Sequence, residues 1–84
     1  MESFSKNLKI CRKRLHVSQE IVAVNCKISY GTYRRYETGE REPSLSTFCA
    51  FADYFGVTLD QLAGRAPLPD EESKDNPQEK KDGR

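Results

Sequence analysis

The chain has 84 residues, of which 36% are hydrophobic and 32% are charged, and its formal net charge at pH 7 is +1. This length fits one small domain and excludes a two-domain enzyme. No apolar run approaches the ~20 residues that a membrane-spanning helix requires, and the first residues lack the pattern of a secretion signal. The near-neutral total charge is not typical of a nucleic-acid-binding protein.

The charge is unevenly distributed along the chain. Residues 1–65 hold ten basic and seven acidic side chains, a net charge of +3, whereas residues 66–84 hold four basic and six acidic ones, a net charge of −2. The second segment contains three prolines and a single large apolar residue, Leu68. Too little apolar surface is present there to offset chain entropy, so we expect a disordered charged tail at 66–84 and a folded domain at 1–65.

Apolar spacing and a capping residue predict the first two helices. In the first, apolar residues recur at the spacing of one helical face, at Phe4, Leu8, Cys11 and Leu15. The pattern breaks before Ser18, which is a favourable N-cap for a second helix. The expected inner residues of that helix are Val22, Ala23 and Cys26.

Ser29 is expected to cap a third helix that turns Tyr33 and Tyr36 inward. Gly39 follows as a C-terminal cap, because glycine readily adopts the left-handed conformation. The second and third helices are separated by a few residues only, which suggests a helix-turn-helix.

A fourth and a fifth helix are predicted in the remainder of the domain. Ser44 and Gly56 are expected to bound the fourth. Its predicted inner residues are Leu45, Phe48, Ala52 and Phe55, with Phe51 beside them. Thr58 and Gln61 form a capping-box pattern for a short fifth helix that ends at Gly64. No run alternates apolar and polar residues as a half-buried strand does, so the expected fold class is all-α.

Neither a metal site nor a catalytic centre is evident. The three cysteines, Cys11, Cys26 and Cys49, are far apart and include no Cys-x-x-Cys pair. We interpret them as core thiols of a protein in a reducing cytoplasm. The single histidine, His16, lies in a turn without a paired nucleophile, and no glycine-rich phosphate loop is present. We therefore expect neither enzymatic activity nor a cofactor.

Several segments of the sequence match a known family in register: Arg12, VSQE at 17–20, VA at 22–23, IS at 28–29, YETG at 36–39, PSL at 43–45 and FGVTLDQL at 55–62. With this spacing, residues 4–64 resemble the Cro and phage-repressor (XRE-type) class of helix-turn-helix DNA-binding domains. The resemblance implies a compact five-helix, lambda-repressor-like domain whose third helix enters the DNA major groove. It also implies a sequence-specific transcriptional regulator, most often a repressor.

The third helix, at about residues 29–37, is then the expected DNA-reading element. If Tyr33 and Tyr36 face the core, the opposite face carries two arginines and a tyrosine but no acid. Arginine side chains either bind guanine in a bidentate manner or pair with phosphate, and simple solvation is the alternative. The candidate DNA-binding residues are Gln19, Ser29, Tyr30, Gly31, Thr32, Arg34, Arg35 and Arg41. The resemblance implies that Gln19 touches a backbone phosphate.

Five positions depart from the family pattern, and two of them, Ile21 and Val24, are apolar where polar residues are usual. Tyr30 and Gly31 stand where polar or basic residues are usual. Glycine inside a helix costs about 1 kcal/mol relative to alanine, so either the missing side chain permits close approach to DNA or the residue has drifted in a helix held by packing. Lys27 stands where the family places glycine, which suggests a differently shaped turn.

The resemblance also implies a structural ion pair between Arg12 and Glu37, which fixes the third helix to the first. A homodimer on double-stranded DNA is expected, because a net charge of +3 gives one copy little non-specific affinity. The candidate dimer residues are Tyr54, Val57, Leu59 and Leu62. No small-molecule ligand is evident. The alternative function is a protein-interaction module on the same fold, such as an antitoxin or anti-repressor partner, which would use Ile21, Val24, Tyr30 and the acidic tail.

Overall fold

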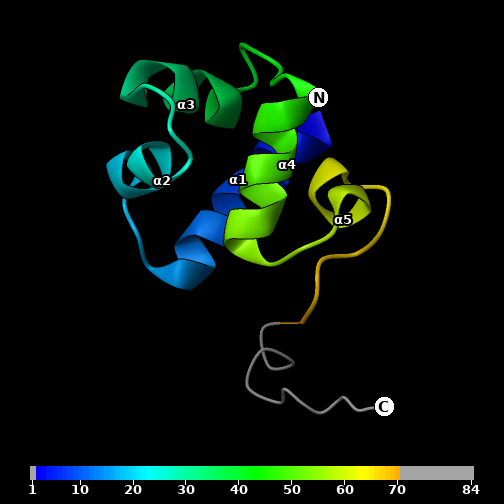
Figure 1. Cartoon of the computed structure of the whole chain (residues 1–84). Helices are drawn as coiled ribbons and strands as arrows, with labels where there is room; N and C mark the ends of the chain where they lie inside the picture. Colours follow the sequence, from blue (N-terminus) through cyan, green and yellow to red (C-terminus); the bar gives the residue numbers. More distant parts are fainter. Residues whose placement is uncertain (1, 71–84) are drawn as a thin grey trace.

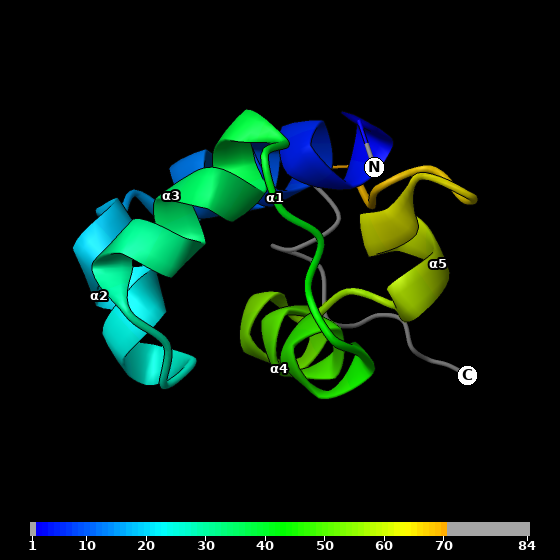
Figure 2. The same cartoon turned by 90° about the horizontal axis from the view of Figure 1, so that it is seen from above.

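The structure is a computed structural model that describes residues 2–70, so the larger part of the predicted tail lies outside the described residues (Figure 1). Within residues 2–70 the chain forms helices only, which confirms the all-α prediction. The five helices are α1 (Glu2–Leu15), α2 (Gln19–Asn25), α3 (Tyr30–Thr38), α4 (Leu45–Phe55) and α5 (Leu59–Ala63). Figures 1 and 2 show α2 and α3 at one end of the domain and α5 at the other.

The predicted helix starts are confirmed by their caps. Ser18, Ser29 and Ser44 each accept a hydrogen bond from the backbone amide three residues further on. Thr58 does the same for α5, and the Gln61 side chain accepts a hydrogen bond from the Thr58 amide, so the capping box is complete. Short polar side chains therefore satisfy backbone amides that have no partner within their own helix.

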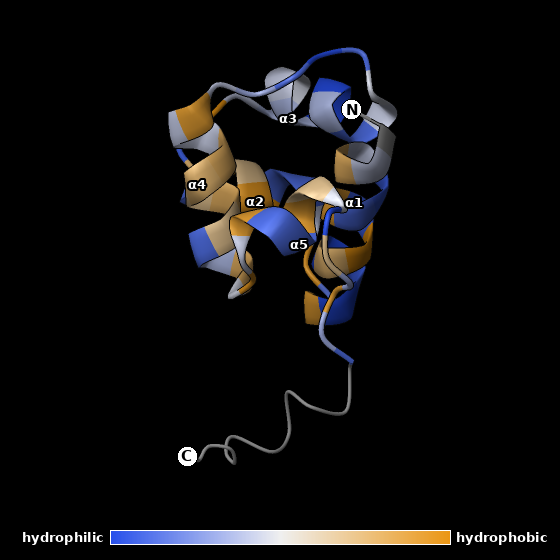
Figure 3. Ribbon diagram, turned by 90° about the vertical axis from the view of Figure 1, so that its right-hand side faces the viewer, coloured by the Kyte–Doolittle hydropathy of each residue, from blue (hydrophilic) through white to orange (hydrophobic). Residues whose placement is uncertain are grey.

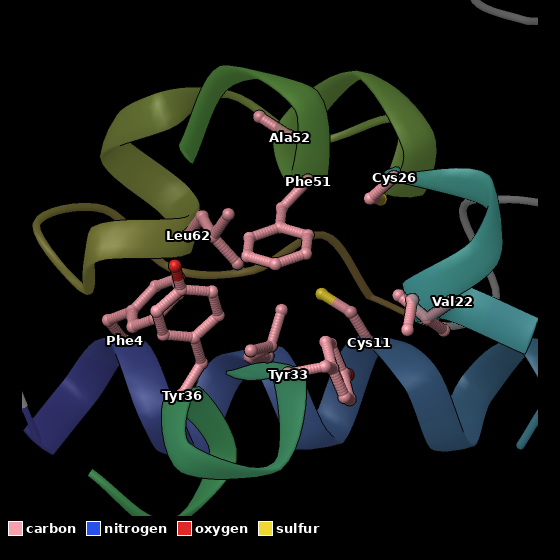
Figure 4. Packing of buried hydrophobic residues seen from close by; sticks show 11 residues of the cluster. Phe4, Cys11, Val22, Cys26, Tyr33, Tyr36, Phe51, Ala52 and Leu62 are labelled. Atoms are coloured by element: carbon pink, nitrogen blue, oxygen red, sulfur yellow. The ribbon is translucent and has the colours of Figure 1, made fainter. Parts of the chain in front are cut away.

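Aromatic rings fill the centre of the core (Figure 4). The ring of Phe51 lies 5.7 Å from the rings of both Tyr33 and Tyr36 and 6.2 Å from that of Phe4, measured between centroids. The edge-to-face orientation of Phe51 toward both tyrosines is favourable for aromatic pairs. Phe51, which we expected beside the inner stripe of its helix, is thus its most central residue.

Two predicted core residues are exposed. Leu45, in the first turn of α4, is 70% exposed, because the core packs against the later turns of that helix. Leu15, the last residue of α1, is also exposed. Figure 3 shows α4 mostly in the orange tones of hydrophobic residues and α3 in paler, more polar tones. The remaining predicted inner residues of α1, α2 and α3 are buried.

The turn between α2 and α3 keeps a conformation that glycine favours, although no glycine is present. Lys27 adopts a left-handed conformation with φ of 63°. The amide of the next residue, Ile28, donates to the carbonyl of Ala23 at 3.0 Å and closes the turn. The altered turn that we expected from the missing glycine is therefore not seen. His16, between α1 and α2, is left-handed too, with φ of 58°.

The chain after α5 packs back onto the helices up to the end of the described residues. The amides of Arg65 and Ala66 donate to the Asp60 carbonyl at 2.8 and 3.2 Å. Leu68 packs against the core, and Arg14 Nη1 donates to the Pro69 carbonyl at 2.5 Å. The packed part of the chain therefore extends past residue 65, where we expected the domain to end. Within residues 2–70, every helix is too short or too polar to cross a bilayer.

Candidate nucleic-acid interface

The two faces of α3 differ sharply in burial. Tyr33, Tyr36 and Glu37 are buried against the other helices. Arg34 and Arg35 are exposed on the opposite face. Tyr30 and Gly31, at the start of the helix, are exposed as well. The predicted division of the helix into an inner and an outer face is confirmed, and Tyr30, Gly31, Arg34 and Arg35 are hereafter called the outer face.

On the outer face, Tyr30 and Arg34 form a stacked pair. The guanidinium carbon of Arg34 lies 5.7 Å from the centre of the Tyr30 ring, within the range of a cation–π contact. These residues are four positions apart, so they are neighbours on one side of the helix. The ring therefore restricts where the guanidinium points while leaving it at the surface.

Arg35 has an acidic neighbour that we did not expect on this face. Its Nε lies 4.0 Å from Oε1 of Glu40, and both side chains are more than half exposed. A surface pair at that distance contributes little to stability. Glu40 is nevertheless placed to oppose any anion that approaches Arg35. Arg41, also exposed, is tied to the end of α3 by a backbone bond from its amide to the Arg35 carbonyl at 3.3 Å.

The predicted contacts Ser29 and Thr32 both take part in the cap of α3. Ser29 Oγ accepts from the Thr32 amide at 3.1 Å and donates to Thr32 Oγ1 at 2.9 Å. This arrangement gives the start of α3 a fixed geometry. Their first role is thus structural, and contact with DNA stays a prediction for both.

The inner face of α3 carries a hydrogen-bond network around Glu37. Arg12 Nε donates to Glu37 Oε2 at 2.7 Å, and Arg12 Nη2 donates to Oε1 at 3.2 Å, so the implied ion pair is present. The Tyr33 hydroxyl donates to Oε2 at 2.5 Å. Gln19 Nε2 donates to Oε1 at 2.9 Å. The bond between Arg12 Nη1 and the Val17 carbonyl, at 3.2 Å, joins the network to the start of α2.

Two members of this network were assigned differently from the sequence. Gln19 was expected at a DNA phosphate, but the structure directs its amide to Glu37. Tyr33 was expected only as a core residue, although it is four residues before Glu37 and therefore on the same side of the helix. The spacing of four residues could therefore have predicted the hydrogen bond from Tyr33 to Glu37.

The network holds its members in fixed charge states. Burial by itself raises the pKa of the Glu37 carboxyl. The hydrogen bonds from Arg12, Tyr33 and Gln19 outweigh burial, so the pKa of Glu37 lies below its ordinary value. The hydrogen bond to Glu37 also raises the pKa of Arg12, against the opposing effect of burial. Burial first, and then the bond to Glu37, raise the pKa of Tyr33. At neutral pH the site is therefore a buried carboxylate with three donors.

The candidate dimer residues do not all reach the surface. Leu62 is 0% exposed and lies in the core, so it offers no surface to a partner. The short helix α5 turns this residue inward. The prediction that Leu62 lies at a dimer surface together with Leu59 is therefore wrong. Leu59 is exposed, and Tyr54 and Val57 are partly buried against the core.

The described residues show no arrangement for a metal. No group of three or more His, Cys, Asp or Glu within residues 2–70 lies close enough together to hold an ion. Cys11 and Cys26 are buried and Cys49 is partly buried, and none of the three forms a disulfide. Burial raises the pKa of the Cys26 thiol, which disfavours the reactive thiolate.

Residues 8–62 match the helix-turn-helix domain family. YqaE, an uncharacterized HTH-type transcriptional regulator of Bacillus subtilis, is 39% identical over 59 residues, which are 70% of this chain and 51% of the relative. AnsR, an HTH-type transcriptional regulator of the same species, is 41% identical over 54 residues, 64% of this chain and 47% of the relative. RstR, the cryptic phage CTXphi transcriptional repressor of Vibrio cholerae, is 33% identical over 54 residues, 64% of this chain and 48% of the relative.

The chain thus spans about half the length of these three relatives. The similarity lies in the part of the chain that contains α2 and α3. No solved structure gave a significant match.

Proposed function

Because the chain belongs to the helix-turn-helix family, we propose that it is a sequence-specific DNA-binding transcriptional regulator. The observation that carries this proposal is the outer face of α3, which presents two arginines and a tyrosine to solvent. An α-helix fits into the major groove, which is about 12 Å wide. A repressor is the favoured form, since one similar protein is named a repressor.

In this proposal α3 enters the major groove and its outer face contacts the DNA. Arg34 and Arg35 bind either guanine edges or phosphates, because a guanidinium suits both. Tyr30 and Gly31 lie at the N-terminal end of the helix, which reaches base edges most directly in helix-turn-helix proteins. Ser29, Thr32 and Arg41 contribute contacts at the two ends of the helix.

The network around Glu37 keeps α3 in place during binding. It joins α3 to α1 through Arg12 and to α2 through Gln19, so the recognition helix is fixed on two sides. We propose that Gln19 acts chiefly in this network. The backbone amides at the N-terminus of α2 then contact a DNA phosphate in place of the Gln19 side chain.

We propose that the regulator binds as a homodimer. Half-sites one helical turn apart, about 34–36 Å, place two copies on the same side of the duplex. Support for a self-contact comes from Tyr54, Val57 and Leu59, which lie near the junction of α4 and α5. The net charge of only +3 on residues 1–65 favours two copies over one, because phosphate contacts supply much of the affinity.

We further propose that the protein acts in the cytoplasm, without a cofactor or small-molecule ligand, and is not an enzyme. That compartment is favoured by DNA as the partner and by three cysteines that form no disulfide. The only histidine, His16, lies in the turn before α2.

Selection of bound sequences from random duplex DNA tests this function. The expected result is a short palindromic motif whose half-sites are one helical turn apart. A chain that enriches no sequence would contradict the proposal.

One observation favours the second candidate function, a protein-interaction module. Val24 is 74% exposed and Ile21 is also exposed on α2, which leaves an apolar pair at the surface. Salt separates the two functions. A DNA reader loses affinity steeply as salt rises and on Arg35→Glu, whereas an interaction module that uses α2 does neither.

A further inference from the structure

Gly31 occupies a position where the fold does not require glycine. The residue lies inside α3 and is absent from the glycines with positive φ, which are Gly39, Gly56 and Gly64 among the described residues. A Cβ atom added to Gly31 would meet no heavy atom within 4 Å. Glycine is nevertheless less favourable than alanine in a helix. Packing within the folded chain therefore gives no reason for a glycine at position 31.

The surface next to Gly31 is hollowed. A depression of about 260 Å³ is lined by Gly31, Arg34, Arg35, Thr38 and Glu40. The Thr38 hydroxyl already donates to the Arg35 carbonyl at 3.1 Å. The stack on Tyr30 restricts the Arg34 guanidinium. The missing side chain at position 31 thus opens one wall of a hollow between two arginines, on the face proposed to meet DNA.

The chemistry of the hollow favours a base edge over a phosphate. Two arginines alone would suit an anion, but the Glu40 carboxylate lies 4.0 Å from Arg35 and opposes one. The C5-methyl of thymine is the apolar group that a base edge presents in the major groove. Cytosine carries only hydrogen at that position, so it would leave the space beside Gly31 unfilled.

We propose that Gly31 is a specificity-determining residue, and that the hollow beside it receives the C5-methyl group of one thymine in each half-site. The proposal rests on the DNA-binding function proposed above. An alanine methyl at position 31 would project into the space that the thymine methyl occupies. The two methyl groups therefore exclude each other. Either the thymine or an alanine at position 31 can place a methyl group in this space, but not both.

A methyl exchange between protein and DNA tests this directly. In the selected duplex, each thymine of a half-site is replaced in turn by deoxyuridine, which removes only the C5-methyl. Affinities are measured for the wild-type protein, for Gly31→Ala and for Val24→Ala, an exposed control on α2 outside the hollow.

At one thymine, the wild-type protein is expected to lose about fourfold in affinity with uracil, the value of one buried methyl-sized group. Gly31→Ala is expected to bind the thymine duplex more weakly than wild type and to regain affinity with uracil at that same position. Val24→Ala is expected to follow the wild-type pattern. The melting temperature of Gly31→Ala should rise, because alanine favours the helix and nothing obstructs it.

The proposal is overturned if Gly31→Ala binds the thymine duplex as tightly as wild type, or if uracil restores its affinity at no position. A fall in the melting temperature of Gly31→Ala would also count against it, since Gly31 would then have a role in the fold. Failure of the regulator function itself looks different, because no duplex would be selected by the wild-type protein.

Discussion

The inner and outer faces of α3 use arginine in opposite ways. At the inner face, Arg12 of α1 is 15% exposed and donates two hydrogen bonds to Glu37, at 2.7 and 3.2 Å. On the outer face, Arg35 is 58% exposed and its nearest acidic atom is 4.0 Å away. A guanidinium whose donors are satisfied holds the fold, whereas one whose donors face water is available to a partner. Substitutions at the inner face should therefore reduce stability, whereas substitutions on the outer face should reduce DNA affinity.

The largest expected effect is on stability, from Arg12→Ala. This change leaves Glu37 buried without its cationic partner, although Tyr33 and Gln19 still donate to it. We expect the free energy of unfolding to fall by about 3 kcal/mol, the lower end for breaking a buried pair. Urea denaturation measures it. Arg34→Ala, on the outer face, is the matched control and should change stability by less than about 0.5 kcal/mol. Equal losses in both variants would remove the distinction between the faces.

The next effect is on DNA affinity, from Arg35→Ala. We expect an affinity loss of about tenfold for the selected duplex, in the range for losing one arginine contact. The stability of this variant should stay at the wild-type value, because Arg35 has only a surface ion pair. Titration at several salt concentrations identifies the contact. A shallower salt dependence indicates a phosphate, and relaxed sequence preference indicates a base. Unchanged affinity would show that Arg35 does not reach the duplex.

A pH effect on stability is expected from the inner face. The pKa of Glu37 is lower in the folded chain than its ordinary value of about 4.3. Its contribution to stability is thus fully present above that ordinary value and is lost as pH falls through the folded pKa. Unfolding measured from pH 7 to pH 3 should show a loss that Glu37→Gln lacks. Parallel curves for the two proteins would mean that Glu37 is not held as a carboxylate.

The smallest effect concerns the turn that carries α3. Lys27 has a φ of 63°, which costs a non-glycine residue energy that glycine avoids. Lys27→Gly should raise the free energy of unfolding by about 0.5–1 kcal/mol, after allowance for the greater chain entropy of glycine. His16→Gly, with φ of 58° before α2, is the matched comparison. Thermal unfolding measures the stability of both variants. Destabilisation by Lys27→Gly would contradict the claim that the positive φ of Lys27 costs energy.

The fold was largely predictable because its signals are local. Serine or threonine caps marked the starts of α2 to α5, and each cap depends on residues within three positions along the chain. Ser5 shows what local patterns miss. It lies in α1 yet is buried, and its hydroxyl donates to the Tyr36 carbonyl at 2.7 Å, a contact across 31 residues. Such a contact depends on how helices pack, which spacing within one helix does not show.

The candidate interface was predictable in part for the same reason. Periodicity placed Arg34 and Arg35 on the outer face, as the structure has them. Periodicity did not show that Gln19 turns toward Glu37, because that bond joins two helices. Nor did it bring Glu40 beside Arg35, since Glu40 lies after the helix, where the chain leaves helical geometry. The resemblance to a family supplied the Arg12–Glu37 pair, which the residues alone did not.

The separation of the two faces is tested most directly by the arginine Nε–H signals in a nitrogen-15 NMR titration. With the selected duplex, we predict that the signals of Arg34 and Arg35 shift strongly and that both shifts shrink as salt rises. The Arg12 signal should stay in place, because its Nε remains bound to Glu37 at 2.7 Å with or without DNA. A large shift of Arg12 together with unmoved signals from Arg34 and Arg35 would contradict the assignment of binding to the outer face.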